Sequence, residues 1–343
     1  MLSHEIGKMV YDTVYKYTKL QNKTKMLYFN YLSRNKSVSD FSKQVDKLWR
    51  DLDHSFMDKQ IDKLQETVHD ENVKLAVAFH KVKKEADTKF KKADTTYYKI
   101  VPESEFRKVE NKFADRVVSN YKKSSISKDK LDSDTYLEKK LESYDSEVNK
   151  VVAYYNKNNE VVRHVDVSTY LSMLHNTNLT RSAWDQTMVD ADKLGAQYFM
   201  IPTHPFSCED CAEFQGIALS RDEVEEYFGL GAEDQVGELL HPNCKCTLSI
   251  LWDPSQLESS QKYNEKYDLE EQEEMYEIRQ KVNGLSLMIE RNQNDIDIAR
   301  MLGNNGLVDE LNNKNAILEK KEKELVNRLP TNSLKKQVEA VNR

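Results

Sequence analysis

The distribution of glycine and proline constrains this chain more than any other feature of its sequence. Between Gly7 and Gly195 there is no glycine, and Pro102 is the single proline. By contrast, residues 195–254 hold five of the nine glycines and four of the six prolines. Because these two residue types interrupt helices and form turns, the contrast predicts long helices first and a tightly turned segment after them.

Residues 1–160 are therefore expected to form several long helices joined by short polar turns. Apolar residues recur at helical spacing, as in Phe106, Val109, Phe113 and Val117. Breaks are expected in three serine- or proline-containing stretches, residues 37–39, residues 101–104, and residues 124–127 with Ser133. The many tyrosines of this region suit either a stacking platform for single-stranded nucleic acid or packing between helices, and we favour packing.

Composition agrees with a helical chain that exposes much of its surface. Charged residues make up 32% and hydrophobic residues 38%, and the mean hydropathy is -0.77, which is typical of exposed helices or coiled coils. No run of about 18 apolar residues is present, so we expect no membrane-spanning helix. The N-terminal residues lack the apolar core of a cleaved secretion signal.

The charge of the chain is unevenly distributed. Residues 1–150 carry 31 Lys and Arg against 25 Asp and Glu, whereas residues 151–343 carry 20 against 33. The first 50 residues alone carry 10 against 4, so the basic excess lies at the N-terminus. A basic segment can meet phosphates or an acidic protein surface, or it can be the solvated face of a lysine-rich helix.

All four cysteines lie within the turned segment, as Cys208-x-x-Cys211 and Cys244-x-Cys246, with His241 just before the second pair. A Cys-x-x-Cys turn brings two thiolates to one ion, and residues two apart on a strand point to one face. Tetrahedral zinc needs four such ligands, and four protein ligands leave no open position. We expect a structural Zn²⁺ held by the cysteines, with His241 as a replacement for Cys244 or as a neighbour of the ligands.

Other readings of the cysteines stay open. They can be reduced thiols that serve packing alone. One of them can be a nucleophile with His204 or His241 as its base, although catalysis of that kind needs an activated thiol and an orienting third group. A His-Asn-His nuclease would need further histidines near the metal. His164 and His175 are expected to be ordinary histidines of a helix.

Short secondary structure elements are expected around the cysteines. We predict helices over residues 161–177 and 178–194, the second ending at Gly195 in a left-handed cap. Short strands are predicted at residues 196–201, 216–219 and 246–252. Ser220 and Glu223 form a capping-box pattern that opens a further helix.

The C-terminal part is expected to be helical again. Ile278, Val282, Leu285 and Ile289 form an apolar stripe, and Leu311, Leu318 and Leu325 continue at seven-residue steps. The turn signal Gly303-Asn-Asn-Gly306 separates the two segments. We predict an antiparallel helical hairpin or coiled coil, residues ~260–302 against ~307–328, followed by a frayed tail after Pro330.

A series of short motifs runs in order through residues 161–254. They are a helix with Val162-Arg163-His164, a helix from Trp184 to Gly195, a strand before His204-Pro205, Ser207-Cys208 with Cys211, Gln215-Gly216, and His241-Pro242-Asn243-Cys244-Lys245-Cys246. In this order they resemble the phage minor capsid protein 2 group and the related Mu F-like phage head morphogenesis proteins. Lys245 stands where the family's His-Pro-x-Cys-Arg-Cys signature has arginine, which keeps the charge and loses the planar fork.

The resemblance implies a non-enzymatic structural protein of the virion, active in head assembly and oligomeric within the particle. Its implied partners are the portal protein or the major capsid protein, and its implied locations are the phage head and, during assembly, the host cytoplasm. The basic first 50 residues would contact packaged DNA, and no membrane is involved. The alternative is a zinc-containing DNA-binding or DNA-processing accessory protein.

Taken together, the sequence predicts a mostly α chain with a small central α+β module and a C-terminal helical hairpin. The predicted domains are an N-terminal helical region (1–160), a module with few short strands and a zinc knuckle (161–254), and a helical hairpin with its tail (255–343).

Overall fold

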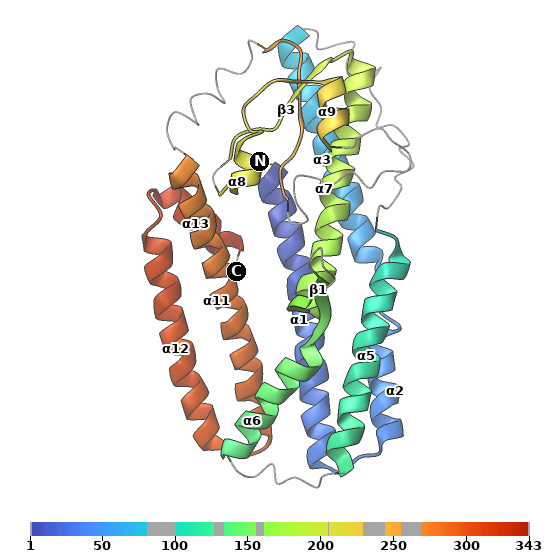
Figure 1. Cartoon of the computed structure of the whole chain (residues 1–343), viewed down its shortest axis with the longest axis vertical. Helices are drawn as coiled ribbons and strands as arrows, with labels where there is room; N and C mark the ends of the chain where they lie inside the picture. Colours follow the sequence, from blue (N-terminus) through green and yellow to red (C-terminus); the bar gives the residue numbers. More distant parts are fainter. Residues whose placement is uncertain are drawn as a thin grey trace. The chain divides into compact units, whose positions relative to one another are not determined.

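The computed structural model describes residues 2–80, 101–126, 134–155, 161–204, 206–228, 244–254 and 269–341 (Figure 1). The predicted fold class is confirmed: the described chain is mostly α-helical and contains a small three-stranded antiparallel sheet next to a cysteine cluster. None of the described helices combines the length and the apolar character that crossing a bilayer requires.

The helices and strands alternate only in the central part of the chain. The helices are α1 (Leu2–Ser33), α2 (Val38–Trp49), α3 (Ser55–His80), α5 (Glu103–Ile126), α6 (Asp134–Tyr144), the π-helical η1 (Asp145–Asn149), α7 (Val167–Leu194), α8 (Glu209–Ala212), α9 (Arg221–Phe228), α11 (Leu269–Met301), α12 (Asn305–Asn327) and α13 (Asn332–Val341). The strands are β1 (Lys150–Tyr155), β2 (Val161–Asp166), β3 (Tyr198–Met200), β4 (Leu219–Ser220) and β5 (Ser249–Leu251).

Two compact units are built from segments that are not consecutive in the sequence. Unit 1 comprises residues 1–10, 54–101 and 173–279, and unit 2 comprises residues 11–53, 102–172 and 280–343. The helices α1, α7 and α11 contribute residues to both. The three consecutive domains expected from the sequence are a different division of the chain and stay a prediction.

Aromatic side chains form much of the core of unit 2. Tyr28 lies edge-on to Phe41, Tyr121 and Tyr144, with ring centroids 5.0–5.9 Å apart. Phe41 of α2 stacks on Tyr121 of α5 at 4.1 Å, and these two helices lie side by side (Figure 1). The packing interpretation is therefore confirmed for Tyr28, because its ring meets the rings of other helices, whereas Tyr97 and Tyr98 lie outside the described residues.

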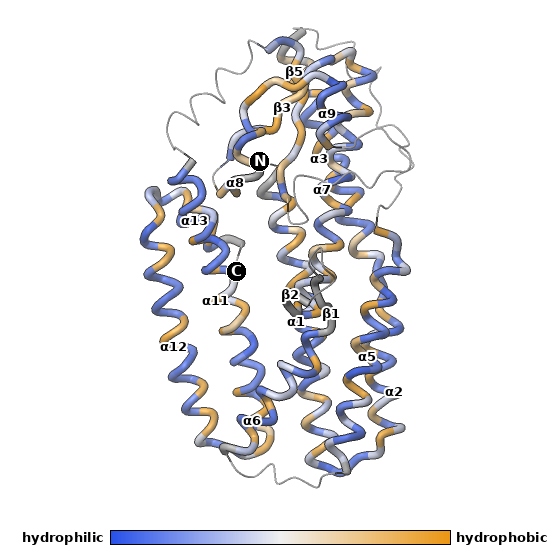
Figure 2. Tube along the Cα trace, viewed as in Figure 1, coloured by the Kyte–Doolittle hydropathy of each residue, from blue (hydrophilic) through white to orange (hydrophobic). Residues whose placement is uncertain are grey.

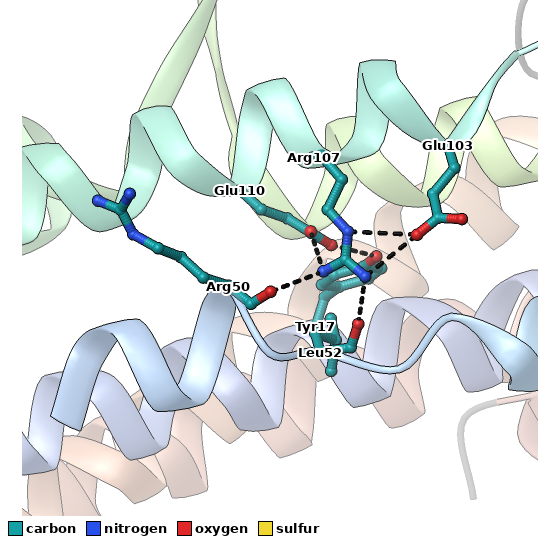
Figure 3. Close-up of polar contacts among 6 residues, drawn as sticks. All are labelled: Tyr17, Arg50, Leu52, Glu103, Arg107 and Glu110. Atoms are coloured by element: carbon teal, nitrogen blue, oxygen red, sulfur yellow. Dashed lines mark hydrogen bonds and ion pairs between the residues drawn. The ribbon is translucent and has the colours of Figure 1, made fainter. Parts of the chain in front are cut away.

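A half-buried arginine and a buried glutamate join three segments of unit 2. The Arg107 guanidinium donates to the main-chain oxygens of Arg50 and Leu52, which follow α2, and also contacts Glu103 (Figure 3). It lies 3.6 Å from the fully buried Glu110, which accepts a hydrogen bond from the Tyr17 hydroxyl of α1. Burial and the Glu110 charge raise the pKa of Tyr17, so its hydroxyl stays a donor.

The predicted C-terminal hairpin is confirmed as α11 and α12. Asn304 caps α12 by accepting from the Leu307 amide, and Gly303 adopts φ 77°, which glycine tolerates without strain. Across the hairpin, Asn292 donates to Asn315 at 2.9 Å and Ser286 bonds Glu322. Apolar residues recur along α12 (Figure 2), in keeping with its buried Leu311 and Leu318.

Three local predictions in unit 2 are wrong. Residues 150–155, which lie in the region expected to be helical, form the strand β1. Residues 161–166 form β2, which pairs antiparallel with β1, and are not the start of a helix. The segment after Pro330 is the helix α13 and not a frayed tail: the Thr331 hydroxyl accepts from the Leu334 amide, and Leu334 and Val338 are buried. A capping hydroxyl together with one buried face is sufficient to order a short helix.

Candidate metal centre

A small sheet in unit 1 forms one wall of the candidate site. Its strand order is β4-β3-β5, antiparallel throughout, and Phe199 of β3 pairs with Leu219 and Ile250. The predicted strands are thus present but shorter than expected, and the second one starts at Leu219. Apolar residues are concentrated in β3 and β5 (Figure 2). They share a buried core with three of the cysteines, Cys211, Cys244 and Cys246.

The ends of the neighbouring helices follow the predicted chemistry. Helix α7 stops at Leu194 because Gly195 takes φ 73°, a left-handed conformation that ends helices. Ser220 and Glu223 form the reciprocal capping box at the start of α9, with hydrogen bonds of 2.7 and 3.3 Å. Buried Val224 and Phe228 then place α9 over the sheet, where Phe228 meets Trp184 of α7.

A row of polar side chains on α7 holds the second cysteine pair. Asn176 and Thr180 both donate to the carbonyl oxygen of Cys244, at 2.9 and 3.0 Å. Trp184 Nε1 donates to the carbonyl of Cys246 at 2.8 Å, and Thr187 donates to that of Leu248. Alternate carbonyls of one extended segment point the same way, and donors three or four residues apart lie on one helix face. The helix therefore fixes the extended segment before β5 that carries both cysteines.

Loss of the indole donor tests this row. Trp184→Phe keeps an aromatic ring in the core but leaves the buried Cys246 carbonyl without its donor, so unfolding should become easier by about 1–3 kcal/mol. Chemical denaturation of the full chain measures the change. Tyr227→Phe is the matched control, because Tyr227 is 53% exposed and its hydroxyl should matter little. Equal stability of the two variants would contradict a structural role for the row.

The buried sulfur atoms have the spacing of metal ligands. Cys211 Sγ and Cys244 Sγ are 3.7 Å apart, and the sulfurs of Cys211, Cys244 and Cys246 all lie within 4.8 Å of one another. Tetrahedral zinc with Zn–S bonds of about 2.3 Å separates its sulfurs by about 3.8 Å. The cysteines are free thiols, since a disulfide would need about 2.05 Å. This buried group could hold a metal ion.

The thiols strongly perturb one another. Hydrogen bonds with Cys208, Cys244 and Cys246, followed by burial, raise the pKa of Cys211. For Cys246, the hydrogen bond with Cys211 lowers the pKa, but the bond with Cys244 and burial raise it well above the ordinary value. Thiols this close cannot all ionise without a cation among them. A bound divalent ion would displace their protons, because the thiolate is the ligand.

The structure brings only some of the predicted ligands together. Cys211 of α8, and Cys244 and Cys246 before β5, are buried and brought together. Cys208 is partly exposed at the N-terminal end of α8 and interacts with Cys211. His241 lies outside the described residues. His175 is buried and bonds Gln60 at 2.8 Å, as expected of an ordinary histidine, and His164 lies on β2.

His204 and Gln215 surround one of the sulfurs. His204 Nε2 lies 3.3 Å from Cys246 Sγ, and the Gln215 amide nitrogen lies 3.7 Å from the same sulfur and 3.2 Å from His204 Nε2. Gln215 also donates to the hydroxyl of Ser207 at 2.7 Å, which fixes the loop before Cys208. Hydrogen bonds to a ligand sulfur orient it and stabilise its thiolate form.

Two cations belong to the segments around the thiols, and sequence analysis missed one of them: Lys245 lies between Cys244 and Cys246 in the chain, and the charge of Arg279 interacts with Cys246 and Cys208. Burial, and then the charge of Arg279, lower the pKa of Lys245 to about 7. Arg279 of α11 has its guanidinium carbon 5.2 Å from the ring centroid of Phe206. Phe206 adopts φ 68°, which is strained for a bulky residue, and it is buried two positions before Cys208. Nothing local in the sequence links Arg279 to cysteines more than thirty positions earlier.

Comparison with protein-family models, with curated proteins and with solved structures finds no match to this chain.

Proposed function

We propose that this chain is a non-enzymatic structural protein of the phage head that contacts the portal or the capsid during assembly. Its central module is held together by a structural zinc ion. The observation that carries the proposal is the convergence of the cysteines: Cys211, Cys244 and Cys246 belong to the motifs that resemble phage head proteins, and their sulfurs meet in one core.

Other motif residues support the same reading. Trp184, which opens the second motif, donates to the Cys246 carbonyl. Gln215, from the Gln-Gly motif, bonds Ser207 and approaches the Cys246 sulfur. Residues spread over sixty positions thus act on a single centre, as expected when a motif encodes one structural site. The helix expected at Val162–His164 is a strand, so that part of the likeness carries no argument.

The helical hairpin offers a surface that suits protein contacts. Met288, Met301 and Ile317 are exposed on α11 and α12, Ile317 by 58%. A groove of about 520 Å³ lies between the two helices, where Leu285, Met288 and Leu325 are flanked by charged side chains. Exposed apolar residues within a charged surface are typical of protein interfaces. Such a surface supports an assembly role.

Location in particles tests the proposal. Phage particles produced from the genome that encodes this chain should retain it through nuclease treatment and density-gradient purification, in few copies relative to the major capsid protein. Quantitative mass spectrometry of the purified heads measures the ratio. A chain that stays wholly in the lysate and is missing from heads, while the capsid protein is recovered, would overturn the assignment.

The alternative, a zinc-containing DNA-binding protein, is favoured by one observation. Of the ten Lys and Arg residues among positions 1–50, all but Lys25 have exposed side chains. A protein that binds duplex DNA through these groups loses affinity log-linearly with salt, with a slope of about -0.9 per phosphate neutralised. We expect weak binding with a shallow slope, measured by fluorescence anisotropy. Tight binding with a steep slope would favour the alternative.

A further inference from the structure

The groove between α11 and α12 has an apolar floor with room for side chains of another molecule. The two helices lie side by side (Figure 1), and Leu285, Met288 and Leu325 line the groove, whose volume is about 520 Å³. A Cβ added at Gly284, which also lines it, would meet no atom of another element within 4 Å. Met288 is 46% exposed. The groove is therefore open at its floor, and its volume falls within the range of ligand pockets, about 300–1,000 Å³.

Cations predominate among the charged residues of the groove. Lys281 of α11 and Lys321 and Arg328 of α12 line it with exposed side chains. Glu324 is the one carboxylate among the lining residues that the structure describes, and it lies 3.9 Å from the ammonium of Lys320, which is not a lining residue. An exposed group of three cations and one carboxylate attracts acidic groups and repels basic ones. The charge of the groove thus favours an acidic partner.

An exposed apolar residue extends this surface along α12. Ile317 is 58% exposed and lies four residues before Lys321 and seven before Glu324, so the three side chains share one side of the helix. From Ile317 to Arg328 this side is about 16 Å long, or about three helical turns, at 1.5 Å per residue. A helix that lies along the groove meets such a surface with side chains at positions i, i+3, i+4 and i+7.

Other occupants match only part of this surface. Duplex DNA would complement the cations, but its phosphates would leave the apolar floor without an apolar partner. A second copy of the chain, bound through the same face, would supply apolar side chains but would bring two sets of cations together. An acidic amphipathic helix meets both requirements, because one of its faces is apolar and the other carries carboxylates.

We propose that the groove binds an acidic amphipathic helix of another protein. The apolar side chains of that helix pack on Leu285, Met288 and Leu325, and its carboxylates pair with Lys281 and Lys321. This inference rests on the assembly role in the proposed function, for which it names the chemistry of the partner. The groove residues belong to unit 2 and the clustered cysteines to unit 1, so the inference does not depend on the zinc ion.

A synthetic peptide tests the groove in the full chain. The probe has about 18 residues, which is long enough to form a helix, with leucines three and four positions apart and glutamates between them. In a control peptide, serine replaces every leucine. Fluorescence anisotropy of the labelled peptides should give a Kd about tenfold lower for the probe than for the control, because only the probe has apolar anchors. The net charge of the chain is -7, so attraction of an acidic peptide requires a local cluster of cations.

Variants of two groove residues locate the binding site. Gly284→Leu places a side chain in the groove and should weaken binding about tenfold, whereas Gly284→Ala adds one methyl group and should leave binding unchanged. Both replace a glycine within a helix, so neither should lower the melting temperature. Lys321→Glu should also weaken binding about tenfold, and more strongly at low salt. Lys323→Glu makes the same change in net charge on the opposite side of α12 and should have no effect.

Equal binding of the two peptides, or binding that Gly284→Leu leaves unchanged, would overturn the inference. Displacement of the probe by duplex DNA would make DNA the occupant. Self-association that analytical ultracentrifugation detects in wild type and in Gly284→Ala, but not in Gly284→Leu, would make a second copy the occupant. Either result would also overturn the inference. Lys321→Glu provides the test where Gly284→Leu does not fold.

The outcome is separable from that of the proposed function. If purified heads contain the chain but the groove does not bind the probe, this inference alone fails. If the groove binds the probe but the chain is missing from heads, the virion assignment fails and the groove remains a docking site for an acidic helix.

Discussion

Cys246→Ser should reduce the bound zinc from about one ion per chain to almost none, and with it the stability of unit 1. The sulfur of Cys246 is buried with those of Cys211 and Cys244, and the extended segment that carries it is fixed by α7. Metal that binds only the folded state at a thousand times its Kd contributes about 4 kcal/mol. For a chain of this size, that corresponds to about 6 °C in Tm.

Elemental analysis and thermal melting of the same samples measure the two effects. Chelation should lower the Tm of the wild-type chain to near that of the variant, while the variant itself should not respond to chelator. Ala212→Ser, beside Cys211 but without a ligand atom, is the matched control and should keep its metal. Where Cys246→Ser fails to fold, Cys208→Ser at the more exposed cysteine replaces it. Folded wild-type protein without metal, equally stable with and without chelator, would rule out the centre.

Local signals explain why much of the fold could be predicted. The Ser37 side chain accepts from the Asp40 amide at the start of α2, and Gly195 and Gly303 end helices with positive φ. Each of these features depends on a few neighbouring residues, so the sequence alone contains the necessary information. The hairpin follows for the same reason, because its turn and its apolar stripe are both local.

Helix α7 shows where such signals fail. The sequence analysis predicts two helices here, over residues 161–177 and 178–194. The middle of α7 is rich in Asn, Thr and Ser, which weaken helices by offering the backbone other hydrogen bonds. In the structure, Asn176 and Thr180 donate hydrogen bonds to the Cys244 carbonyl and do not compete for the backbone of their own helix. The helix stays continuous because tertiary partners satisfy these side chains. The signal in the sequence for one continuous helix is a row of hydrogen-bond donors three or four residues apart, namely Asn176, Thr180, Trp184 and Thr187.

The candidate site also has one part that local sequence signals predict and another part that depends on tertiary packing. The spacing of the two cysteine pairs and the turn residues around them predict that the cysteines converge, and three of the sulfurs do lie together. Arg279 lies on another helix, and its place over Phe206 depends on the packing of the whole unit. A contact between segments that are distant in the sequence produces no local residue pattern, so the sequence does not predict it. It becomes visible only once the neighbouring side chains are placed.

A second large effect is expected from Lys25 of α1, the one buried cation among the basic N-terminal residues. Its Nζ lies 2.8 Å from Asp145 of η1 and 2.6 Å from Asp295 of α11, with 4% of the side chain exposed. Lys25→Met would leave two carboxylates facing each other without a cation. Removing one partner of a buried ion pair costs about 3–5 kcal/mol, so unit 2 should be destabilised by about that much at neutral pH.

The pH dependence of this loss identifies its cause. Burial raises the pKa of Asp295, Lys25 lowers it, and Asp145 raises it, so without Lys25 the pKa rises further. An aspartate with a raised pKa costs stability when it is ionised, and the cost disappears as pH falls through the raised pKa. The gap between Lys25→Met and wild type, measured by urea denaturation, should therefore narrow from about pH 7 toward about pH 5. Lys23→Met, at an exposed lysine of the same helix, should show no loss at either pH. A loss that stays the same across this range would mean that the packing of the lysine stem, and not its charge, stabilises the unit.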